Sequence, residues 1–332
     1  MISYNIPDIP TANLEGYFGN SGIIAQKLPS FESRPQQLEM ASAVQKAFKR
    51  GRFLTVEAGT GVGKSFAYLV PAILAASRSD EKVLISTFTI NLQEQLINKD
   101  IPFLAECMEC DFKAVLAKGR NNYLCKRRLD YALRKQKGPV SRTSAELQTI
   151  KEWSARTDDG SLSDLHFSPS GEVWDAVKSE HGNCRNRKCG HNEGCFYWRA
   201  RKRLATANVI VVNHALLFSD LVLKDKGIPL LPPYKYIIID EAHNIESVAE
   251  NHFGINVSDR SIEYMTKRLY NPAAKKGLLT YMNAPEAKEA VRNIEGKSKQ
   301  FFGLIREWYH ENKKENNGRC FKGFMDDGLS EY

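Results

Sequence analysis

The stretch that decides the fold is FLTVEAGTGVGKS, residues 53–65. Its apolar beginning predicts a β-strand, and the run FAYLVPAILAA at residues 66–76 predicts a helix directly after it. Between them lies a glycine-rich loop ending in Lys64 and Ser65. Such loops close main-chain N–H groups around phosphate oxygens, while the lysine reaches the outer phosphates and the hydroxyl holds Mg²⁺. The stretch therefore predicts a phosphate loop between a strand and a helix.

The candidate nucleotide ligands form the continuous run Ala58, Gly59, Thr60, Gly61, Val62, Gly63, Lys64 and Ser65. Ala58 stands where the strict pattern has its first glycine, and the later glycines still supply the tight curve. The alternative interpretation is a glycine-rich turn with a chance lysine. Gln36, ahead of the helical stripe at residues 38–48, is a candidate for reading the adenine edge, because its amide both donates and accepts.

A second motif, DEAH at residues 240–243, follows the apolar run Ile237-Ile238-Ile239. A carboxylate at Asp240 can hold Mg²⁺ together with Ser65, and one at Glu241 can orient or deprotonate an attacking water. Further strands are expected at residues 83–86 and 112–117, with a helix from about residue 90 between them. This alternation predicts an α/β fold with a parallel sheet that carries both motifs at one edge.

The loop after the strand at residues 83–86 contains Ser86, Thr87 and Thr89. These hydroxyls could contact nucleic-acid phosphates or cap the following helix, and capping is the favoured interpretation.

Composition narrows the class of protein. The chain has 332 residues, with 47 Lys and Arg against 39 Asp and Glu, a formal charge of +8. This balance fits a polyanionic partner or an ordinary solvated surface. Neither a basic and apolar leader nor about 18 consecutive apolar residues is present, so a soluble, cytoplasmic protein without a membrane is expected. The seven cysteines do not suggest a secreted disulfide framework.

Four cysteines form a candidate metal centre: Cys125, Cys184, Cys189 and Cys195. Their spacing, one remote cysteine and a C-x4-C-x5-C triplet, favours an iron–sulfur cluster over zinc, which more often uses paired C-x2-4-C knuckles. His181 and His191 are alternative zinc ligands or solvent-exposed loop residues. The Cys107/Cys110 pair is expected to pack without chemistry, and Cys320 has no visible role.

Basic and aromatic residues gather around these cysteines. The aromatic residues Tyr123, Phe196, Tyr197 and Trp198 alternate with basic residues that follow Cys125 and fill residues 185–203. Basic side chains follow a phosphate backbone and aromatic faces stack on bases, so this segment is expected to bind single-stranded nucleic acid.

In this order and spacing the motifs RPQQ, EAGTGVGKS, STFTINLQEQL, GRNNYLC, C-x4-C-x5-C, VVNHALL and IIIDEAHN resemble the DinG/XPD branch of superfamily-two DNA helicases, over roughly residues 17–250. The resemblance implies a RecA-like ATP-binding domain at residues 1–120 and 204–256. It implies a 4Fe-4S domain inserted at 121–203 and the start of a helical arch at 257–332. It also implies 5′-to-3′ movement on single-stranded DNA, with ATP as substrate and Mg²⁺ as cofactor.

Carried over residue by residue, the resemblance implies that Gln36 contacts the adenine and that Lys64 and Ser65 bind the phosphates and Mg²⁺. It implies that Asp240 binds the metal, that Glu241 acts on the water, and that His243 couples the site to DNA-binding motifs. It also implies that the four cysteines are the cluster ligands. Forked or structured DNA in repair or replication is the implied substrate.

Family members also have a second RecA-like domain with an arginine finger, which has no counterpart in residues 1–332. We therefore expect a monomer or a chain that needs a partner with that domain, and weak ATP binding without turnover. The alternatives are a single-strand-binding module with vestigial nucleotide binding and a zinc-stabilised nucleotide-binding protein unrelated to DNA.

Overall fold

The computed structural model describes residues 13–59, 61–78, 81–136, 141–253 and 257–316, so Thr60 and Cys320 lie outside the described residues. The chain divides into two compact units, Met1–Phe253 and Gly254–Tyr332, which are taken separately below.

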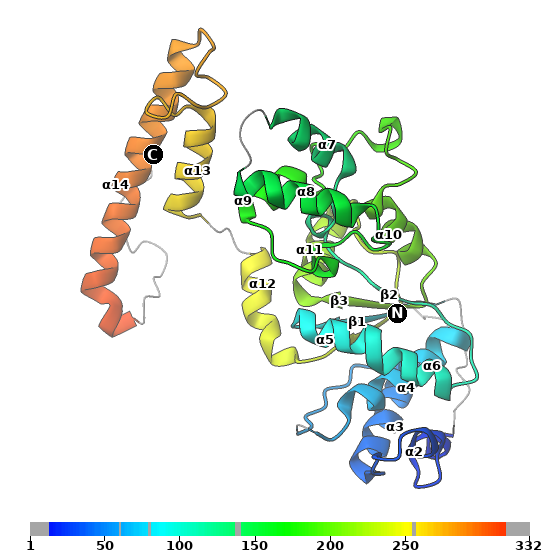
Figure 1. Ribbon diagram of the computed structural model, residues 1–332. Helices are drawn as coiled ribbons and strands as arrows, with labels where there is room; N and C mark the ends of the chain where they lie inside the picture. Colours follow the sequence, from blue (N-terminus) through cyan, green and yellow to red (C-terminus); the bar gives the residue numbers. More distant parts are fainter. Residues whose placement is uncertain (1–12, 60, 79–80, 137–140, 254–256, 317–332) are drawn as a thin grey trace. The chain divides into compact units, whose positions relative to one another are not determined.

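The first unit is built on a parallel sheet, and its described residues form four strands in the order β2-β3-β1-β4 (Figure 1). Val83 of β1 pairs with Val209 of β3 on one side and with Tyr236 of β4 on the other. The expected α/β fold with a parallel sheet is therefore confirmed. The strands are β1 (Val83–Thr87), β2 (Ala114–Leu116), β3 (Val209–Asn213) and β4 (Tyr236–Ile239).

Helices cover both faces of this sheet because its central strands are apolar on both sides. Val83 and Ile85 belong to one buried cluster, whereas Leu84 and Ile210 belong to another. The helices of the first unit are α1 (Glu15–Phe18), α2 (Ile23–Lys27), α3 (Pro35–Arg50), α4 (Lys64–Arg78), α5 (Ile90–Gln95), α6 (Ile101–Cys107), α7 (Lys126–Lys135), α8 (Arg142–Ser154), α9 (Gly171–Val177), α10 (Phe196–Ala205), α11 (His214–Asp225) and α12 (Ile245–Phe253).

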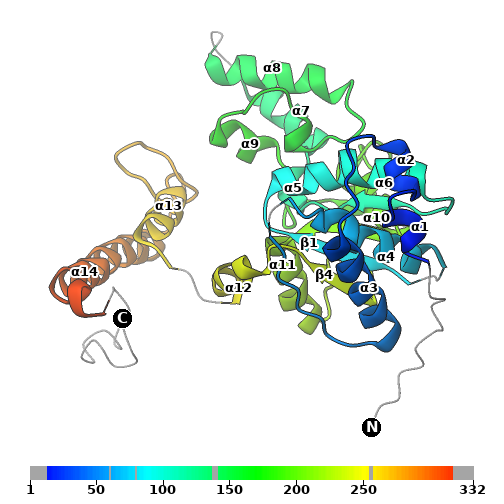
Figure 2. The same cartoon turned by 90° about the horizontal axis from the view of Figure 1, so that it is seen from below.

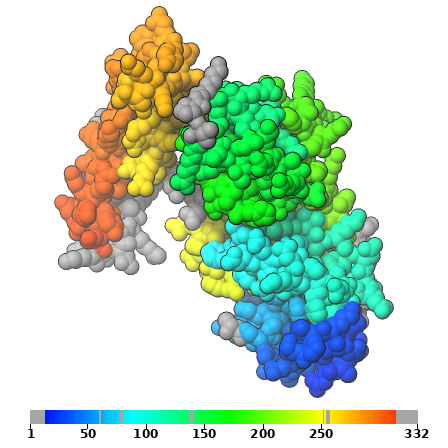
Figure 3. All heavy atoms as spheres, viewed as in Figure 1, coloured from blue at the N-terminus to red at the C-terminus, as the bar shows by residue number. Residues whose placement is uncertain are grey.

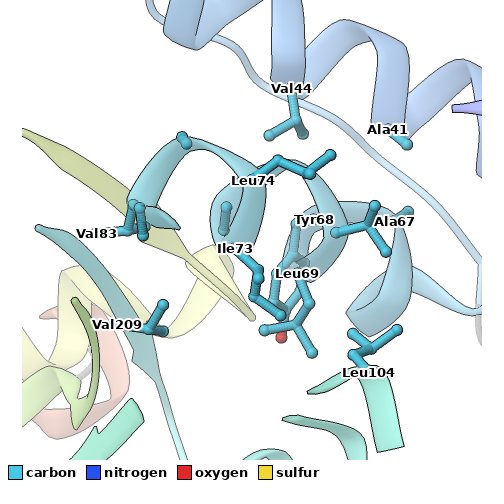
Figure 4. Close-up of a cluster of buried hydrophobic side chains, with 14 of the residues drawn as sticks. Ala41, Val44, Ala67, Tyr68, Leu69, Ile73, Leu74, Val83, Leu104 and Val209 are labelled. Atoms are coloured by element: carbon cyan, nitrogen blue, oxygen red, sulfur yellow. The ribbon is translucent and has the colours of Figure 1, made fainter. Parts of the chain in front are cut away.

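Helix α4, which begins at Lys64 of the phosphate loop, is the centre of the larger buried cluster. Figure 4 shows Ala41 and Val44 of α3 on one side of it and Val83 and Val209 of the sheet on another. Tyr68, Leu69 and Ile73 of α4 are at most 2% exposed. The helix that carries the phosphate-binding lysine is thus fixed by packing on several sides.

The strand expected at the start of the phosphate-loop stretch is absent, and this prediction was wrong. Residues 53–59 have no regular secondary structure and make no backbone hydrogen bond with another described residue. Phe53 is fully exposed, and Leu54 and Val56 are exposed as well. A strand exists only by pairing with a neighbour, so an apolar run without such a neighbour stays extended and unpaired.

The described part of residues 121–203 contains helices α7, α8 and α9 and most of α10, which the weak sequence periodicity did not reveal. Helices α7, α8 and α9 contact one another and lie side by side in Figures 1 and 2. They bury a core of their own, separate from the clusters on the sheet and built around Leu129, Leu147, Ile150, Trp153, Val173, Trp174 and Phe196. In the space-filling view this segment is the green mass above the cyan residues of α5 and α6 (Figure 3).

The second unit is a helix pair in its described residues. Helix α13 (Asp259–Leu269) begins with a capping box at Ser258 and Ser261, and α14 (Pro285–Asn316) contacts it. Arg306 Nη1 lies 3.1 Å from Asp259 Oδ2. This agrees with the helical composition of residues 257–332.

None of the described helices combines the length and apolar character needed to cross a bilayer.

Candidate functional site

The phosphate loop depends on two glycines with left-handed backbone conformation. Gly61 and Gly63 both have φ of 78°, a region that residues with a side chain rarely adopt. At Gly63 space is restricted as well, because an added Cβ would lie 2.2 Å from Nε2 of Gln37. Glycine at position 63 is therefore required by both backbone and packing.

Two residues of the RPQQ motif hold this loop. The Gln37 amide is 2% exposed and donates a hydrogen bond to the carbonyl of Gly63 at 2.9 Å. Arg34 donates to the carbonyl of Gly61. Gln36, the residue expected at adenine, is exposed on α3. Sequence reasoning missed Gln37, since only a buried position distinguishes it from its neighbour.

The two motifs expected at one sheet edge do meet there. Lys64 Nζ lies 3.6 Å from Glu241 Oε1, and both side chains are about one-third exposed. Glu241 has a φ of 53°, so the DEAH turn holds a non-glycine residue in the left-handed region. Strained backbone of this kind is common at functional sites.

Asp240 is oriented from three sides. Tyr68 of α4 donates its hydroxyl to Asp240 Oδ2 at 3.0 Å, and the Glu241 N–H donates to Oδ1 at 3.0 Å. The Asp240 N–H donates to the carbonyl of Ser86 in β1 at 2.8 Å. Burial first, and the Asp240 charge second, raise the pKa of Tyr68 well above its usual value, so this hydroxyl stays a donor.

Ser65 also interacts with the Tyr68 hydroxyl, where it lowers the pKa of that group. The two oxygens expected at Mg²⁺, on Ser65 and Asp240, are therefore brought together around one buried tyrosine. Tyr68 is a site residue that the sequence did not reveal, because its position on α4 reads as core.

His243, the last residue of the DEAH motif, is mostly exposed. Its Nδ1 lies 3.6 Å from Glu241 Oε2, and Nε2 lies 2.9 Å from the side-chain amide nitrogen of Asn244. The histidine thus borders the Glu241 carboxylate and faces solvent.

The hydroxyls expected on the loop after β1 prove to be mainly structural, and Ser86 and Thr87 belong to the strand itself. Thr89 caps α5 by accepting a hydrogen bond from the Leu92 N–H at 3.2 Å, as favoured from sequence. Ser86 and Thr87 are fully buried, so neither is exposed to a nucleic-acid phosphate. Phe88, which lies between Thr87 and Thr89, is 44% exposed.

The four candidate cluster cysteines line one cavity: Cys125, Cys184, Cys189 and Cys195. The main-chain N–H of Asn186 donates to Cys184 Sγ at 3.4 Å, and the N–H groups of Tyr197 and Trp198 lower the pKa of Cys195 against a larger rise from burial. Four thiols around one cavity, with N–H donors directed at sulfur, fit an iron–sulfur cluster by donor set. Among described residues, however, no three cysteine, histidine or acidic groups lie close enough to form a metal site.

His191, Cys107 and Cys110 have other contacts. His191 pairs with Asp130, with 3.0 Å between Nε2 and Oδ2. Cys107 is buried in the main core and Cys110 packs against that core, as expected.

The aromatic residues expected to stack on bases are largely structural instead. Tyr123 is 2% and Phe196 is 1% exposed, and both belong to the core of residues 123–196. The Arg120 guanidinium covers the Tyr197 ring at 4.4 Å. The proposed stacking role was therefore wrong for Tyr123 and Phe196. Their large apolar rings fill the core of this segment and are not accessible to a nucleic-acid base.

Several basic residues of the same segment also have internal partners. Arg128 lies 2.5 Å from Glu180 and donates to main-chain carbonyls of α9, and Arg199 donates to the carbonyl of Asp158. The exposed basic set that remains is Arg185, Arg187, Lys188, Lys202 and Arg203.

A phosphate loop and an acidic pair at one edge of a parallel sheet are typical of an α/β P-loop nucleotide-binding domain. Residues 172–262 match the family model DEAD_2. The ATP-dependent DNA helicase YoaA of Escherichia coli (strain K12) is 38% identical over 253 residues, which cover 75% of this chain and 39% of YoaA.

Two further relatives carry the name DinG. The ATP-dependent helicase DinG of Mycobacterium tuberculosis (strain ATCC 25618 / H37Rv) is 37% identical over 230 residues, covering 64% of this chain and 34% of that protein. The 3'-5' exonuclease DinG of Bacillus subtilis (strain 168) is 27% identical over 312 residues, covering 90% and 33%. A solved structure titled Truncated XPD has a TM-score of 0.41 and 19% identity, covering 80% of this chain and 64% of that one, too little to support an argument.

Over the matched residues the chain is thus similar to the helicases named DinG and YoaA, as its motifs predicted. It spans 39% of YoaA and 34% of the mycobacterial DinG.

Proposed function

We propose that this chain is the ATP-binding part of an ATP-dependent DNA helicase that moves 5′ to 3′ on single-stranded DNA in the cytoplasm, during repair or replication. One observation carries the proposal: Lys64 of the phosphate loop, Asp240 held by Tyr68, and Glu241 meet at one sheet edge. The names of the relatives support DNA and ATP as the substrates.

The residues divide the work of hydrolysis among them. Nucleotide phosphates compete with Glu241 for Lys64, and their arrival frees that carboxylate to orient or deprotonate water. Ser65 and Asp240 would hold Mg²⁺, which neutralises charge on the phosphates. Loop N–H groups at Ala58–Gly63 surround the phosphates, and Gln36 is proposed at the adenine. His243, beside Glu241 and open to solvent, is proposed to link this site to DNA.

The cysteine cavity is proposed to hold a 4Fe-4S cluster on Cys125, Cys184, Cys189 and Cys195. Its support is the shared cavity, the N–H donors toward sulfur and the spacing of the ligands. We propose the same domain boundaries as from sequence: a RecA-like domain at 1–120 and 204–256, the cluster domain at 121–203, and an arch beginning at 257.

The proposed nucleic-acid partners are single-stranded and forked or structured DNA, bound through the exposed basic set near the cysteines. The chain is proposed to act as a monomer, or with a chain that supplies a second RecA-like domain.

The nucleotide half of the proposal is tested by binding of Mg-ATP to the 332-residue chain. Lys64→Ala removes charge-assisted contacts of about 1.5–3 kcal/mol, so the Kd should rise about 10- to 150-fold. Glu241→Gln, the matched control at the other end of the same ion pair, should leave binding nearly intact. Equal binding by wild type and Lys64→Ala would favour the module with vestigial nucleotide binding.

A further inference from the structure

A buried histidine lies between the loop after β1 and the DEAH turn and has no part in the nucleotide chemistry described above. His214 is the first residue of α11 and is 1% exposed. Its Nδ1 lies 2.7 Å from Oγ of Ser86, which is itself fully buried near the end of β1. The pair therefore ties the end of β1 to the helix that follows β3.

The same histidine faces the DEAH turn. Burial lowers the pKa of His214, and the main chain of Asp240 and Glu241 raises it by a smaller amount. Ser86, the hydrogen-bond partner of His214, also accepts the main-chain N–H of Asp240 at its carbonyl at 2.8 Å, so Ser86 connects the ring to the turn. Yet Nε2 is buried and makes no hydrogen bond with any residue that the structure describes.

The Ser86 contact sets the tautomer of the neutral ring. When the Ser86 hydroxyl donates to Nδ1, the proton of the imidazole is on Nε2. A buried donor without a partner costs free energy. Any arrangement of the turn that brings a carbonyl within reach of Nε2 is favoured by the recovery of that cost.

The turn has a reason to rearrange when nucleotide binds. Glu241 has left-handed backbone, and its carboxylate contacts Lys64 at 3.6 Å. When nucleotide phosphates bind Lys64, its contact with Glu241 is lost. The ring of Phe88 lies 6.3 Å from the His214 ring between centroids, and Phe88 is 44% exposed, as a residue that stacks on a base must be.

We infer that His214 is a positioning residue that couples the DEAH turn to the exposed loop at Phe88. When Lys64 leaves Glu241, Nε2–H of His214 donates to the main chain of the turn, and the contacts with Ser86 and Phe88 carry the shift to the loop. Mg-nucleotide and single-stranded DNA then bind with linked affinities. This inference rests on the proposed function.

The test measures this linkage in the 332-residue chain. The Kd of a non-hydrolysable ATP analogue with Mg²⁺ is measured with and without saturating oligothymidine, and the Kd of oligothymidine is measured with and without the analogue. Linkage requires the same factor in both directions, and we expect about tenfold.

Two substitutions separate coupling from simple packing. His214→Asn keeps a polar group near Nδ1 for Ser86 but has no donor at the Nε2 position, so the factor should fall to about one while each separate Kd stays within about threefold. His214→Gln places an amide donor near Nε2 and should keep part of the factor. Ser86→Ala, a small change in the core, should also reduce it.

The matched control is His252→Gln, which removes the histidine of a second Ser–His pair, with 3.3 Å between Ser219 Oγ and His252 Nδ1. Its factor should equal that of wild type. A wild-type chain that binds both ligands without linkage, or a His214→Asn chain that keeps the full factor, overturns the inference. A wild-type chain that binds neither ligand overturns the proposed function itself.

Discussion

The nucleotide site and the cysteine cavity are held together in different ways. Lys64 begins a helix whose residues from Ala67 to Ile73 include several that are at most 2% exposed, and Asp240 follows a strand paired with β1. The cysteines instead lie in loops and at helix starts: Cys125 precedes α7, Cys195 precedes α10, and Cys184 and Cys189 flank a single short turn. The first site is set by the sheet, whereas the second depends on whatever its thiols bind.

The largest effect is expected at the cysteine cavity. Cys184→Ser should lose the iron and loosen residues 121–203, because ligation there adds to the stability of the fold. Anaerobically purified wild type should contain about four iron and four sulfide per chain. Iron analysis and hydrogen exchange measure both effects, and Mg-ATP binding should change little.

Cys110→Ser is the control for this loss, since Cys110 packs against the main core and should leave the iron unchanged. Stoichiometric zinc in a colourless protein would contradict the cluster and favour a zinc site.

A matched pair of core substitutions tests whether the two regions are energetically separate. Ile150 in α8 and Ile85 in β1 are both fully buried, but in different clusters. Each change to Ala should cost about 2–5 kcal/mol. Ile150→Ala should raise hydrogen exchange in α7 to α9 and leave the Kd of Mg-ATP within about twofold, whereas Ile85→Ala should weaken nucleotide binding. The same response to both would mean that the regions unfold as one.

Within the nucleotide site, the Tyr68 hydroxyl should have a moderate effect. Tyr68→Phe removes one hydrogen bond to Asp240 and keeps the ring in the core. We expect the Mg²⁺ dependence of ATP binding to shift by about 2- to 10-fold toward higher metal, corresponding to about 0.5–1.5 kcal/mol. Metal titration at fixed ATP measures it, and Tyr236→Phe, in β4, is a control. An unchanged titration would mean that Asp240 is oriented without Tyr68.

Much of the nucleotide site could be predicted from sequence because its determinants are local. A run of apolar residues followed by Gly-Lys-Ser or Asp-Glu specifies strand, turn and charge in a short stretch, and β1, β4 and α4 lie within two residues of the expected bounds. The prediction of a strand at the start of residues 53–65 was wrong because the pairing of strands is not determined by local sequence. Gln37, Tyr68 and His214 could not be found, since their roles come from contacts 26 to 172 residues away along the chain.

The cysteine region was predicted less well for a related reason. Its spacing identified four cysteines that do share a cavity. The helices around them have mixed surfaces, so their periodicity is weak, and Tyr123 and Phe196 looked like stacking residues while they supply the core. Sequence thus identified which cysteines lie together better than it identified the helices around them.

The smallest expected effect concerns the joint between α8 and α9 in the cysteine region. Glu146 of α8 accepts hydrogen bonds at 2.8 Å from both the main-chain N–H and the hydroxyl of Ser170, which precedes α9. The two hydrogen bonds from Ser170 lower the pKa of Glu146 below its usual 4.5, and Arg142 lowers it further by a smaller amount. A carboxyl whose pKa is lower in the folded than in the unfolded protein stabilises the fold at pH values above its unfolded pKa. This contribution is lost as the pH falls through the folded pKa.

Glu146→Gln should therefore lower the thermal midpoint of this region slightly at neutral pH, and the difference from wild type should disappear as the pH falls below 4.5 and through the lowered folded pKa. Trp153 on α8 and Trp174 on α9 provide fluorescence from both sides of the joint, and Glu263→Gln is the control, a second carboxyl of lowered pKa in the other unit. Mg-ATP binding should not respond, because no determinant of the phosphate loop touches Glu146. A Glu146→Gln difference that persists in acid would show that shape, and not the carboxylate charge, holds α8 to α9.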